Sequence, residues 1–544
     1  MKQTIYYNGT ILTMRGEEIV EAILVEDGRI RDVGSNNEIL NRKSPEAEVI
    51  NLEGKTMLPA FIDPHSHFTS VASMLDKVDL SGCGSMKEIR DRLKAFRKEK
   101  GLADDAMLVG TGYDHNDLPG YQHPTAADLA DPELPNRARD GQLETLAPCI
   151  GCLLGCVPNM LHMGVANARM LEKLGITKDT PDPEGGRYGR LDDGTPNGYM
   201  EENAFIQVVM GMPAPSDEEI AASYAEAQKV YASHGITTAQ DGMTSTENAE
   251  RLEQFGKSDA CYMDIVGYAD LRSATGAISD DPYTYHGHYR TGGYKLFLDG
   301  SPQGRTAWMS EPYLGGEPGY CGYPIYSDEQ ASELIRVAIS RNKQLLTHCN
   351  GDAASEQLLR CYTQVKKELG STADLRPVMV HCQTVRPDQL DRMAPLGMIA
   401  SYFVVHTYYW GDVHLRNFGE RRGKMISPMR AGIDRGVMYT MHQDTPVVPP
   451  DMLLTIWAAV NRVSKNGTDM GADQRISVWE ALRGVTINAA YQYFEEKEKG
   501  SIEPGKRADL VILDHNPLAV PAMELKNIKV LETIKDGTAI YQAE

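Results

Sequence analysis

Short apolar segments alternate with longer amphipathic ones through most of the chain, and this alternation constrains the fold more than any other feature. The apolar segments are residues 236–241, 294–300, 344–352, 377–385, 397–405 and 437–444. The amphipathic segments between them have apolar residues at helical spacing, at 218–235, 327–343 and 353–370. Strands that are apolar on both faces are typical of parallel sheets covered by helices. So many βα units in succession predict an α/β fold, a closed (β/α)8 TIM-like barrel.

Both ends of the chain differ from this middle region. Short β-type segments separated by turns occupy residues 4–14, 22–34, 48–60, 508–518 and 530–542. Asn-Gly at 8–9 and Asp-Gly at 27–28 and 536–537 are hairpin signals. We expect the two ends to form one small sheet domain. Gly- and Pro-rich residues 180–198 and 299–324 are expected to be long loops over one mouth of the barrel, where loops usually carry function.

Charge and hydropathy narrow the class of partner. The 544 residues carry 55 basic and 76 acidic side chains, a net charge of −21, which disfavours nucleic acid and anionic membranes as partners. No segment approaches the roughly 20 apolar residues of a membrane span, and the first residues lack the features of a signal peptide. We therefore expect a cytoplasmic enzyme with a small-molecule substrate, acting as a homo-oligomer, in the simplest case a dimer.

Cysteine usage agrees with a reducing compartment. Nine cysteines without regular spacing suit free thiols better than a disulfide framework. Cys149, Cys152 and Cys156 form the single cluster. As a zinc site this cluster lacks a second pair of ligands at a suitable distance, so ordinary thiols are the simpler interpretation.

Two histidines, His65 and His67, stand one residue apart in AFIDPHSHF, directly after an apolar segment. Side chains at i and i+2 of a strand point to the same face, so both imidazoles would project together from the end of the strand. Such a pair is suited to a metal ion, although two polar residues on an exposed turn would have the same spacing.

Polar residues end the later apolar segments in the same way. They are Lys295, Asp299, His348, Asp352, His381, His442 and Asp444. Because the C-terminal ends of barrel strands converge on one site, we expect these side chains to become neighbours. Taken singly, each histidine could instead be a hydrogen-bonded core residue and Asp444 a turn residue.

An ordered series of motifs runs nearly from end to end of the chain. The motifs are LPAFIDPHSHF, HPTAADL, HGITTAQDG, YKLFLDGSPQGRTA, THCNGDAA, VHCQTV, HQDTPVVPP and GSIEPGKRADLVILD. The series resembles the amidohydrolase superfamily and, more closely, its YtcJ-like branch (amidohydrolase family 3), which includes N-substituted formamide deformylases. The resemblance implies a composite β-sandwich of residues 1–56 and 497–544, and a metal-dependent hydrolase barrel of residues 57–496 with an inserted segment at about 75–215.

The resemblance also implies a ligand set, carried over by matching position. His65 and His67 would bind one metal ion, and His348 and His381 a second. Asp444 would contact the first ion and the attacking water. The expected cofactor is one or two divalent ions, with Zn²⁺ favoured because imidazole and carboxylate-type oxygen suit it, and manganese or iron as alternatives.

Lys295 would bridge both ions as a carboxylated lysine. A carbamate is an anionic oxygen donor, whereas an ammonium has no lone pair to offer. The alternative is an unmodified Lys295 paired with Asp299 or Asp352.

The implied reaction is hydrolysis by metal-bound hydroxide. Divalent ions lower the pKa of a shared water towards neutrality, and one of them polarises the scissile carbonyl. Asp444 would take the proton of this water and pass it to the leaving nitrogen. The leading hypothesis is cleavage of a C–N bond in a small amide, such as an N-acyl or N-formyl amine or a cyclic amide. Another bond in the same barrel (an ester, a deaminated ring, a decarboxylated acid) and a non-catalytic regulator with this fold are the alternatives.

Further residues stand where the family places pocket or supporting groups. They are His162, Glu202, Asp241, Asp299 and Arg305. Residues of VVHTYYWGDVHL could add an aromatic wall with polar tips, suited to a substrate with an apolar portion. These residues are His406, Tyr408, Tyr409, Trp410 and His414. For each residue, bracing a loop or packing in the core is the alternative.

Overall fold

The computed structural model describes residues 2–75, 77–101, 107–113, 118–129, 144–148, 163–210 and 215–544. The chain divides into two compact units, residues 1–68 with 224–544, and residues 69–223. The domain boundaries expected from the sequence stay a prediction.

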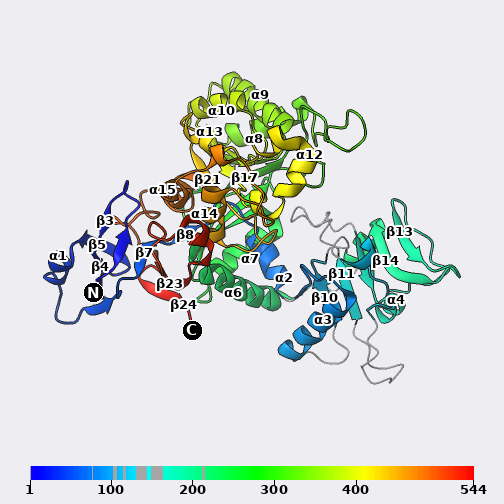
Figure 1. The fold of residues 1–544 in the computed structure, drawn as a ribbon, viewed down its shortest axis with the longest axis horizontal. Helices are drawn as coiled ribbons and strands as arrows, with labels where there is room; N and C mark the ends of the chain where they lie inside the picture. The colour runs from blue at the N-terminus through cyan, green and yellow to red at the C-terminus, as the bar shows by residue number, and fades with distance from the viewer. Residues whose placement is uncertain are drawn as a thin grey trace. The chain divides into compact units, whose positions relative to one another are not determined.

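An eight-stranded parallel sheet forms the centre of the first unit (Figure 1). Its strands, in spatial order, are β21 (Tyr439–Met441), β20 (Ile399–Tyr402), β19 (Val378–His381), β18 (Gln344–Cys349), β17 (Tyr289–Phe297), β16 (Asp264–Asp270), β15 (Ile236–Thr244) and β8 (Phe61–Ile62). Every residue of β18 and of β19 is buried, as expected for strands covered on both faces. The predicted α/β class is thus confirmed as a curled, TIM-like parallel sheet.

The two end strands of this sheet meet through the segments that follow them. The amide of His67 donates to the carbonyl of Thr445 at 2.8 Å, and the amide of Asp444 to the carbonyl of His65 at 3.3 Å. Two segments nearly 400 residues apart in sequence are thereby hydrogen-bonded at the C-terminal ends of β8 and β21.

Amphipathic helices follow the strands. They are α6 (Asp217–Ser233), α7 (Thr246–Gly256), α8 (Asp328–Ser340), α9 (Asp352–Glu368), α10 (Pro387–Met393), α11 (His406–Tyr409), α12 (Gly411–Gly423), α13 (Met429–Ile433), α14 (Met452–Asn461), α15 (Val478–Gly484) and α16 (Ile487–Gln492). Helix α8 shows why they form: Ser327 and Gln330 make a capping box at its N-terminus, and Ile335 and Ile339, four residues apart, are buried on one face.

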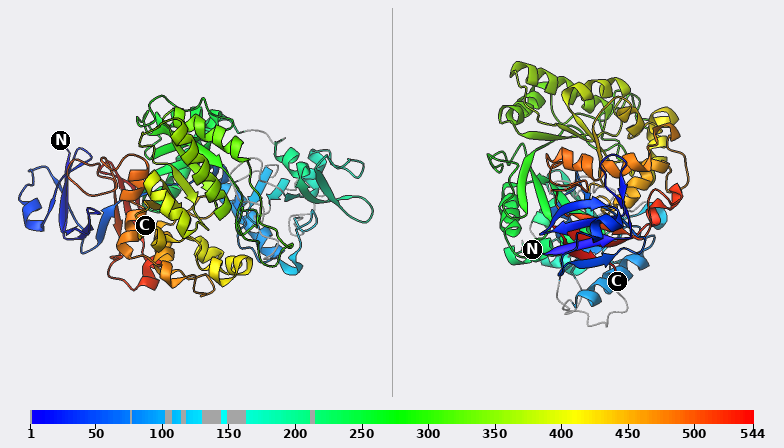
Figure 2. Two further views of the ribbon diagram at one scale, coloured as in Figure 1. Left: turned by 90° about the horizontal axis from the view of Figure 1, so that it is seen from above. Right: turned by 90° about the vertical axis from the view of Figure 1, so that its left-hand side faces the viewer.

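Strands from both ends of the chain share one sheet of the first unit. Its order is β24 (Thr538–Gln542), β23 (Val530–Lys535), β22 (Leu510–Leu513), β7 (Thr56–Pro59), β2 (Thr10–Leu12) and β3 (Ile19–Val20). A second sheet contains β5 (Arg29–Gly34), β4 (Ala22–Glu26), β1 (Gln3–Tyr7) and β6 (Glu48–Asn51), and α1 (Asn36–Leu40) follows β5. Figure 2 shows the blue N-terminal and red C-terminal strands side by side.

The second unit has its own mixed sheet. The strands are β13 (Gly186–Arg190), β14 (Pro196–Glu202), β12 (Met163–Ala166), β11 (Glu144–Pro148), β10 (Met107–Thr111) and β9 (Val78–Asp79). The accompanying helices are α2 (Phe68–Met74), which starts at the unit boundary, α3 (Met86–Lys100), α4 (Ala168–Lys173) and α5 (Asn203–Met210). Across the residues that the structure describes, every helix is too short or too polar to cross a bilayer.

Candidate metal centre

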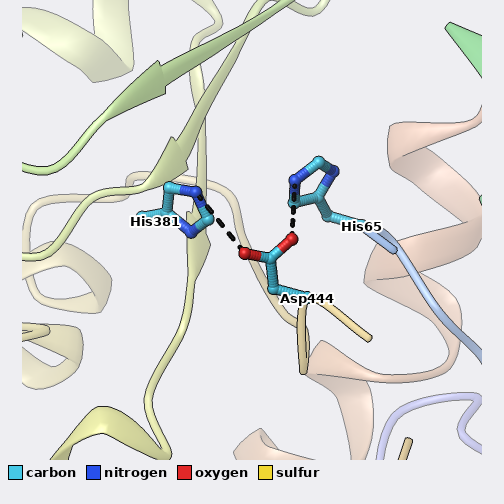
Figure 3. Close-up of side chains that lie close together, drawn as sticks. All are labelled: His65, His381 and Asp444. Carbon is cyan, nitrogen blue, oxygen red and sulfur yellow. Dashed lines mark ion pairs between the residues drawn. The ribbon is translucent and has the colours of Figure 1, made fainter. Parts of the chain in front are cut away.

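The carboxylate of Asp444 lies among the imidazoles that the sequence brings to the strand ends. Its Oδ1 is 3.3 Å from Nε2 of His65 and 3.1 Å from Nε2 of His67, and its Oδ2 is 3.9 Å from Nε2 of His381. Figure 3 shows His65 and His381 on opposite sides of this carboxylate, each facing a different oxygen. Ligand atoms of His65, His381 and Asp444 all lie within 4.8 Å of one another, a spacing that suits one metal ion.

The backbone of two of these residues is in the left-handed region. His381 has φ 72° and Asp444 has φ 55°, conformations that side chains other than glycine adopt at an energetic cost. His381 is the last residue of β19, and Asp444 is the third residue after β21, so both side chains belong to turns at the C-terminal ends of these strands. Gly242 leaves room for the imidazole of His65, because a Cβ atom at this position would lie 2.6 Å from Cε1 of His65.

Two further histidines border this group. Nε2 of His442 is 3.1 Å from Nδ1 of His381, and Nδ1 of His442 is 2.9 Å from the hydroxyl of Ser401. The rings of His348 and His381 are 4.5 Å apart, edge to face. Nδ1 of His348 lies 3.2 Å from Oδ1 of Asp299. Nε2 of His348 lies 3.2 Å from the side-chain Nδ2 of Asn350.

Lys295, near the end of β17, is also part of the group. Its Nζ lies 3.1 Å from Nε2 of His65, and only 1% of the residue is exposed. The ammonium also lies 5.0 Å from the centre of the Phe297 ring. The structure thus brings together six residues expected from the sequence. They are His65, His67, Lys295, His348, His381 and Asp444.

Burial dominates the electrostatics of this site. Burial, and after it the charge of Lys295, lowers the pKa of His65 to about 3. Burial likewise holds the pKa of His381 and of His442 well below the usual value. Burial disfavours ionisation of Asp444, but the facing imidazoles of His65 and His67 outweigh it and hold the pKa of Asp444 well below its usual range. The shifts favour neutral His65 and His381 beside an anionic Asp444, the protonation states that a metal ion requires of its ligands.

The other residues expected at the site make contacts within loops. Asp299 accepts hydrogen bonds from the backbone amides of Trp308, Asn350 and Gly351, at 2.7 to 3.0 Å. Arg305 donates to Oδ1 of Asn417 at 2.8 Å and to a loop carbonyl. Both side chains therefore brace loops near the strand ends.

The expected aromatic wall is a packed cluster. The ring of Trp410 lies 4.5 Å from that of His406, whose Nδ1 is 3.1 Å from Nε2 of His414. Tyr408 and Tyr409 pack edge to face. Trp410 is partly exposed, whereas both histidines are buried.

Asp241 is buried and accepts a hydrogen bond from the Thr244 hydroxyl at 2.8 Å.

Some sequence predictions lie outside the described residues. They concern His162, the side chain of Glu202, and Cys149, Cys152 and Cys156. The six cysteines that the structure describes in full are free thiols.

Gln240, Tyr493 and Ser401 belong to this site and were missed by sequence reasoning. Gln240 contacts His65, Tyr493 contacts Gln240, and Ser401 contacts His442. A glutamine inside the apolar segment 236–241 is the one signal that could have pointed to a buried polar role.

Comparison with known proteins agrees with this geometry. Residues 48–541 match the model of the amidohydrolase family. The chain belongs to that family. It is 28% identical to the N-substituted formamide deformylase of Arthrobacter pascens, over 100% of this chain and 99% of that one. It is 27% identical to the amidohydrolase YtcJ of Bacillus subtilis (strain 168), over 99% of each chain.

A solved structure shows the same fold as this amidohydrolase. The uncharacterized metal-dependent hydrolase from Pyrococcus horikoshii superposes with a TM-score of 0.75 at 24% identity, covering 96% of this chain and 99% of that one. Family membership makes the protein a hydrolase that acts on carbon–nitrogen bonds other than peptide bonds.

Proposed function

We propose that the protein is a metal-dependent hydrolase that cleaves the C–N bond of a small N-formyl or N-acyl amine, or of a cyclic amide. One observation carries this proposal. Oδ1 of Asp444 is buried and has no hydrogen-bond partner among the described residues, although two imidazole nitrogens lie within 3.3 Å of it. A buried carboxylate oxygen without a donor is costly, and a cation between these atoms would remove the cost.

The donor set fits a divalent ion. We assign His65 and His67, which face Oδ1 of Asp444, to one ion together with Asp444. His381, which faces Oδ2, is close enough to join this ion or to bind a second one with His348, and we propose zinc because neutral imidazole and carboxylate suit it. A bound divalent ion supplies Lewis acidity and lowers the pKa of a water at the site.

Asp444 would move the proton in this reaction. Its carboxylate is ionised, so it can accept a proton from water and return that proton to the leaving nitrogen. For a formamide the balance is one water consumed, one C–N bond broken, and one amine and one formic acid released. The left-handed backbone of Asp444 holds the carboxylate at this position.

We further propose that Lys295 is carboxylated and bridges two ions. Its Nζ is buried, 3.1 Å from Nε2 of His65 and 5.0 Å from the centre of the Phe297 ring. A free ammonium there would repel a dication, whereas a carbamate would attract it. Reaction of the neutral amine with carbon dioxide forms the N–C bond and releases one proton.

The full-length relative named as a formamide deformylase supports N-formyl amines as the first substrates to test. We also propose that the two terminal sheets form a composite β-sandwich, since Met57 and Ile30 share one core with Leu510 and Ile534. A cytoplasmic location accords with the free thiols of the described residues. A homodimer stays a prediction.

Metal content and formate release test the proposal together. We expect wild-type protein to contain one or two equivalents of zinc by elemental analysis and to release formate from a panel of N-alkyl- and N-arylformamides. His65→Ala should lose most of the metal and the activity. His515→Ala is the matched control, because the side chain of His515 is 66% exposed. Full metal occupancy and normal turnover in His65→Ala would refute the assignment.

The carbamate has its own test. Lys295→Ala should lose the second equivalent of metal, and short carboxylic acids added to this variant should restore part of it. A wild-type crystal structure should show a planar three-atom group beyond Nζ that contacts both ions. A plain lysine with a single ion would contradict this part of the proposal and leave the rest standing.

A further inference from the structure

Gln240 is a polar side chain buried completely in the middle of the apolar strand β15. Its side-chain Oε1 lies 2.6 Å from Nδ1 of His65, and its Nε2 donates to the carbonyl of Pro64 at 2.7 Å and to the hydroxyl of Tyr493 at 2.9 Å. The glutamine thus contacts both the imidazole of His65 and the backbone of Pro64, the residue directly before it.

The orientation of this amide follows from its partners. A peptide carbonyl can only accept hydrogen bonds, so the atom of Gln240 that faces Pro64 must be the nitrogen. The hydroxyl of Tyr493 donates to the carbonyl of Asp63 at 2.7 Å, so it is free to accept from the same nitrogen. Both constraints leave the amide oxygen facing His65.

The tautomer of His65 follows in turn. An amide oxygen cannot donate, so a 2.6 Å contact with Nδ1 requires that Nδ1 carry the proton. With the proton on Nδ1, the only nitrogen of this ring that can offer a lone pair is Nε2, the atom that faces Asp444 and Lys295.

We propose that Gln240 is a positioning residue: its amide oxygen holds His65 as the Nδ1–H tautomer and presents the Nε2 lone pair to the metal ion. This inference rests on the proposed function, because it gives His65 the role of a metal ligand. Outer hydrogen bonds of this kind orient ligand imidazoles and raise their basicity, and their loss typically costs about 10- to 100-fold in metal affinity.

Backbone contacts make Gln240 a rigid support. Its amide lies 3.4 Å from the hydroxyl of Ser66, which donates to the carbonyl of Gln240 at 3.2 Å. The carbonyl of Pro64 accepts a second hydrogen bond, from Nε2 of Gln492 at 2.8 Å. The turn that carries His65 is therefore fastened to β15 on both sides of the imidazole.

The chain offers a matched control in Gln344 of β18. This glutamine is 2% exposed, accepts from the Tyr268 hydroxyl at 2.5 Å, and donates to the carbonyls of Arg376 and Gln492. Like Gln240 it uses its side-chain oxygen once and its side-chain nitrogen twice, but none of these three contacts is with an imidazole.

Cobalt titration of chelator-treated protein tests the role, with visible absorption reporting the coordination. We expect Gln240→Met to weaken Co²⁺ binding by about 10- to 100-fold. Gln344→Met should change the affinity less than twofold at a similar loss of thermal stability. Gln240→Glu should restore binding to within about threefold of wild type, because a protonated carboxyl group still accepts from Nδ1 through one oxygen and donates to the Pro64 carbonyl through the other.

Three outcomes would overturn the inference. They are wild-type affinity in Gln240→Met, an equal loss of affinity in both methionine variants, and failure of Gln240→Glu to recover affinity. If the His65→Ala variant binds Co²⁺ as tightly as the wild-type protein does, the proposed function is refuted instead.

A neutron structure of the wild-type protein is independent of how well the variants fold. The inference requires a deuteron on Nδ1 of His65, between the ring and Gln240. A deuteron on Nε2, or an Nδ1 without one, contradicts it.

Discussion

Two buried polar clusters in the first unit differ in how their charged side chains are paired. The imidazole cluster consists of His65, His67, His381, His442 and Asp444, at the C-terminal ends of the strands. The ion cluster consists of Asp264, Arg290, Glu495, Lys499, Asp509 and Lys535, with Asp264 as the first residue of β16. Both clusters are almost fully buried.

The ion cluster compensates its charges internally. Nζ of Lys499 lies 2.6 Å from Asp264 and 2.9 Å from Glu495, and Nζ of Lys535 lies 3.1 Å from Asp264 and 3.0 Å from Asp509. Burial disfavours the charges of Lys499 and Asp264, yet the opposite charges around them prevail. The pKa of Lys499 is raised and that of Asp264 lies well below its usual value.

In the imidazole cluster the carboxylate of Asp444 faces histidines, and the ammonium of Lys295 lies in the same site, 3.1 Å from Nε2 of His65. The pKa of Asp444 lies well below its usual range, burial lowers the pKa of His65 to about 3, and Oδ1 of Asp444 has no hydrogen bond within the described chain. Charges that are paired within the protein have a structural role, whereas a buried carboxylate facing imidazoles is a candidate ligand site. The difference agrees with a structural role for the ion cluster and with the metal site proposed at the imidazole cluster.

The largest effect expected is on catalysis, at Asp444. Asp444→Asn should lower kcat by about 10²- to 10⁴-fold, because it removes a proton-transfer group, while the protein stays folded. Asparagine tolerates the left-handed backbone that Asp444 adopts, so the turn should survive. Asp388→Asn, whose side chain is 62% exposed, controls for the substitution itself. Steady-state formate release measures both, and near-normal turnover in Asp444→Asn would show that the carboxylate serves the fold.

Breaking the ion cluster should affect stability instead. Lys499→Met leaves Asp264 and Glu495 with fewer buried partners and should lower the free energy of unfolding by about 3 kcal/mol. Activity per folded molecule should stay at the wild-type level, since no member of the ion cluster contacts an imidazole of the site. Lys497→Met, at an exposed position two residues earlier, should change stability by less than about 0.5 kcal/mol. Urea unfolding followed by circular dichroism decides between these outcomes.

Much of the fold and part of the site follow from sequence because local patterns carry them. Apolar segment 377–385 contains β19, which ends at His381 because that residue turns the chain with φ 72°. Segment 294–300 predicts only the end of β17, whose first residues, including Gly292 and Gly293, lack apolar character. Long-range partners carry no such signal.

Gln240 and His65 illustrate the part that sequence reasoning cannot reach. They are 175 residues apart, and Lys499 and Asp264 are 235 residues apart. Nothing local distinguishes Asp264 from an exposed aspartate, because its burial depends on which lysines the fold brings to it. The ligand histidines could be predicted because each ends an apolar strand, whereas their supports lie inside other strands.

The pH dependence of stability should distinguish the two regions. The groups that respond first as pH falls are the buried histidines His406 and His414, next to the imidazole cluster. Burial lowers the pKa of His414 to about 3, below its ordinary value of 6.5, so between these values the unfolded chain binds a proton that the folded chain does not. Stability is therefore lost as pH falls below 6.5, by about 1.4 kcal/mol per pH unit for each such group. The pKa of Asp264 is also lowered, but from an ordinary value of 3.8, so its contribution to stability is lost only as pH falls below about 3.8.

His414→Phe tests this assignment. The ring of His414 stacks on Phe418 with an interplanar angle of 11°, so phenylalanine fits the same packing. The variant should lose about 1.4 kcal/mol per pH unit of the wild-type pH dependence between pH 6 and 4.5, measured by urea midpoints. His515→Gln, at an exposed position, should leave the slope unchanged. An unchanged slope in His414→Phe would mean that this imidazole is protonated in the folded protein.

The smallest effect is expected at a helix cap outside both clusters, and it gives a reference value for the losses of unfolding free energy predicted above. Ser327 caps α8: its side chain accepts from the backbone amide of Gln330, whose own side chain bonds back to the backbone of Ser327. Ser327→Ala should cost about 1 kcal/mol in unfolding free energy and nothing in activity, because it leaves one helix amide without a partner. Ser340→Ala, near the other end of α8, removes a hydroxyl that donates to the carbonyl of Arg336 and should be nearly neutral. If Lys499→Met costs no more than Ser327→Ala, the ion cluster stabilises the fold no more than one helix cap does, and the contrast between the two clusters loses its energetic basis.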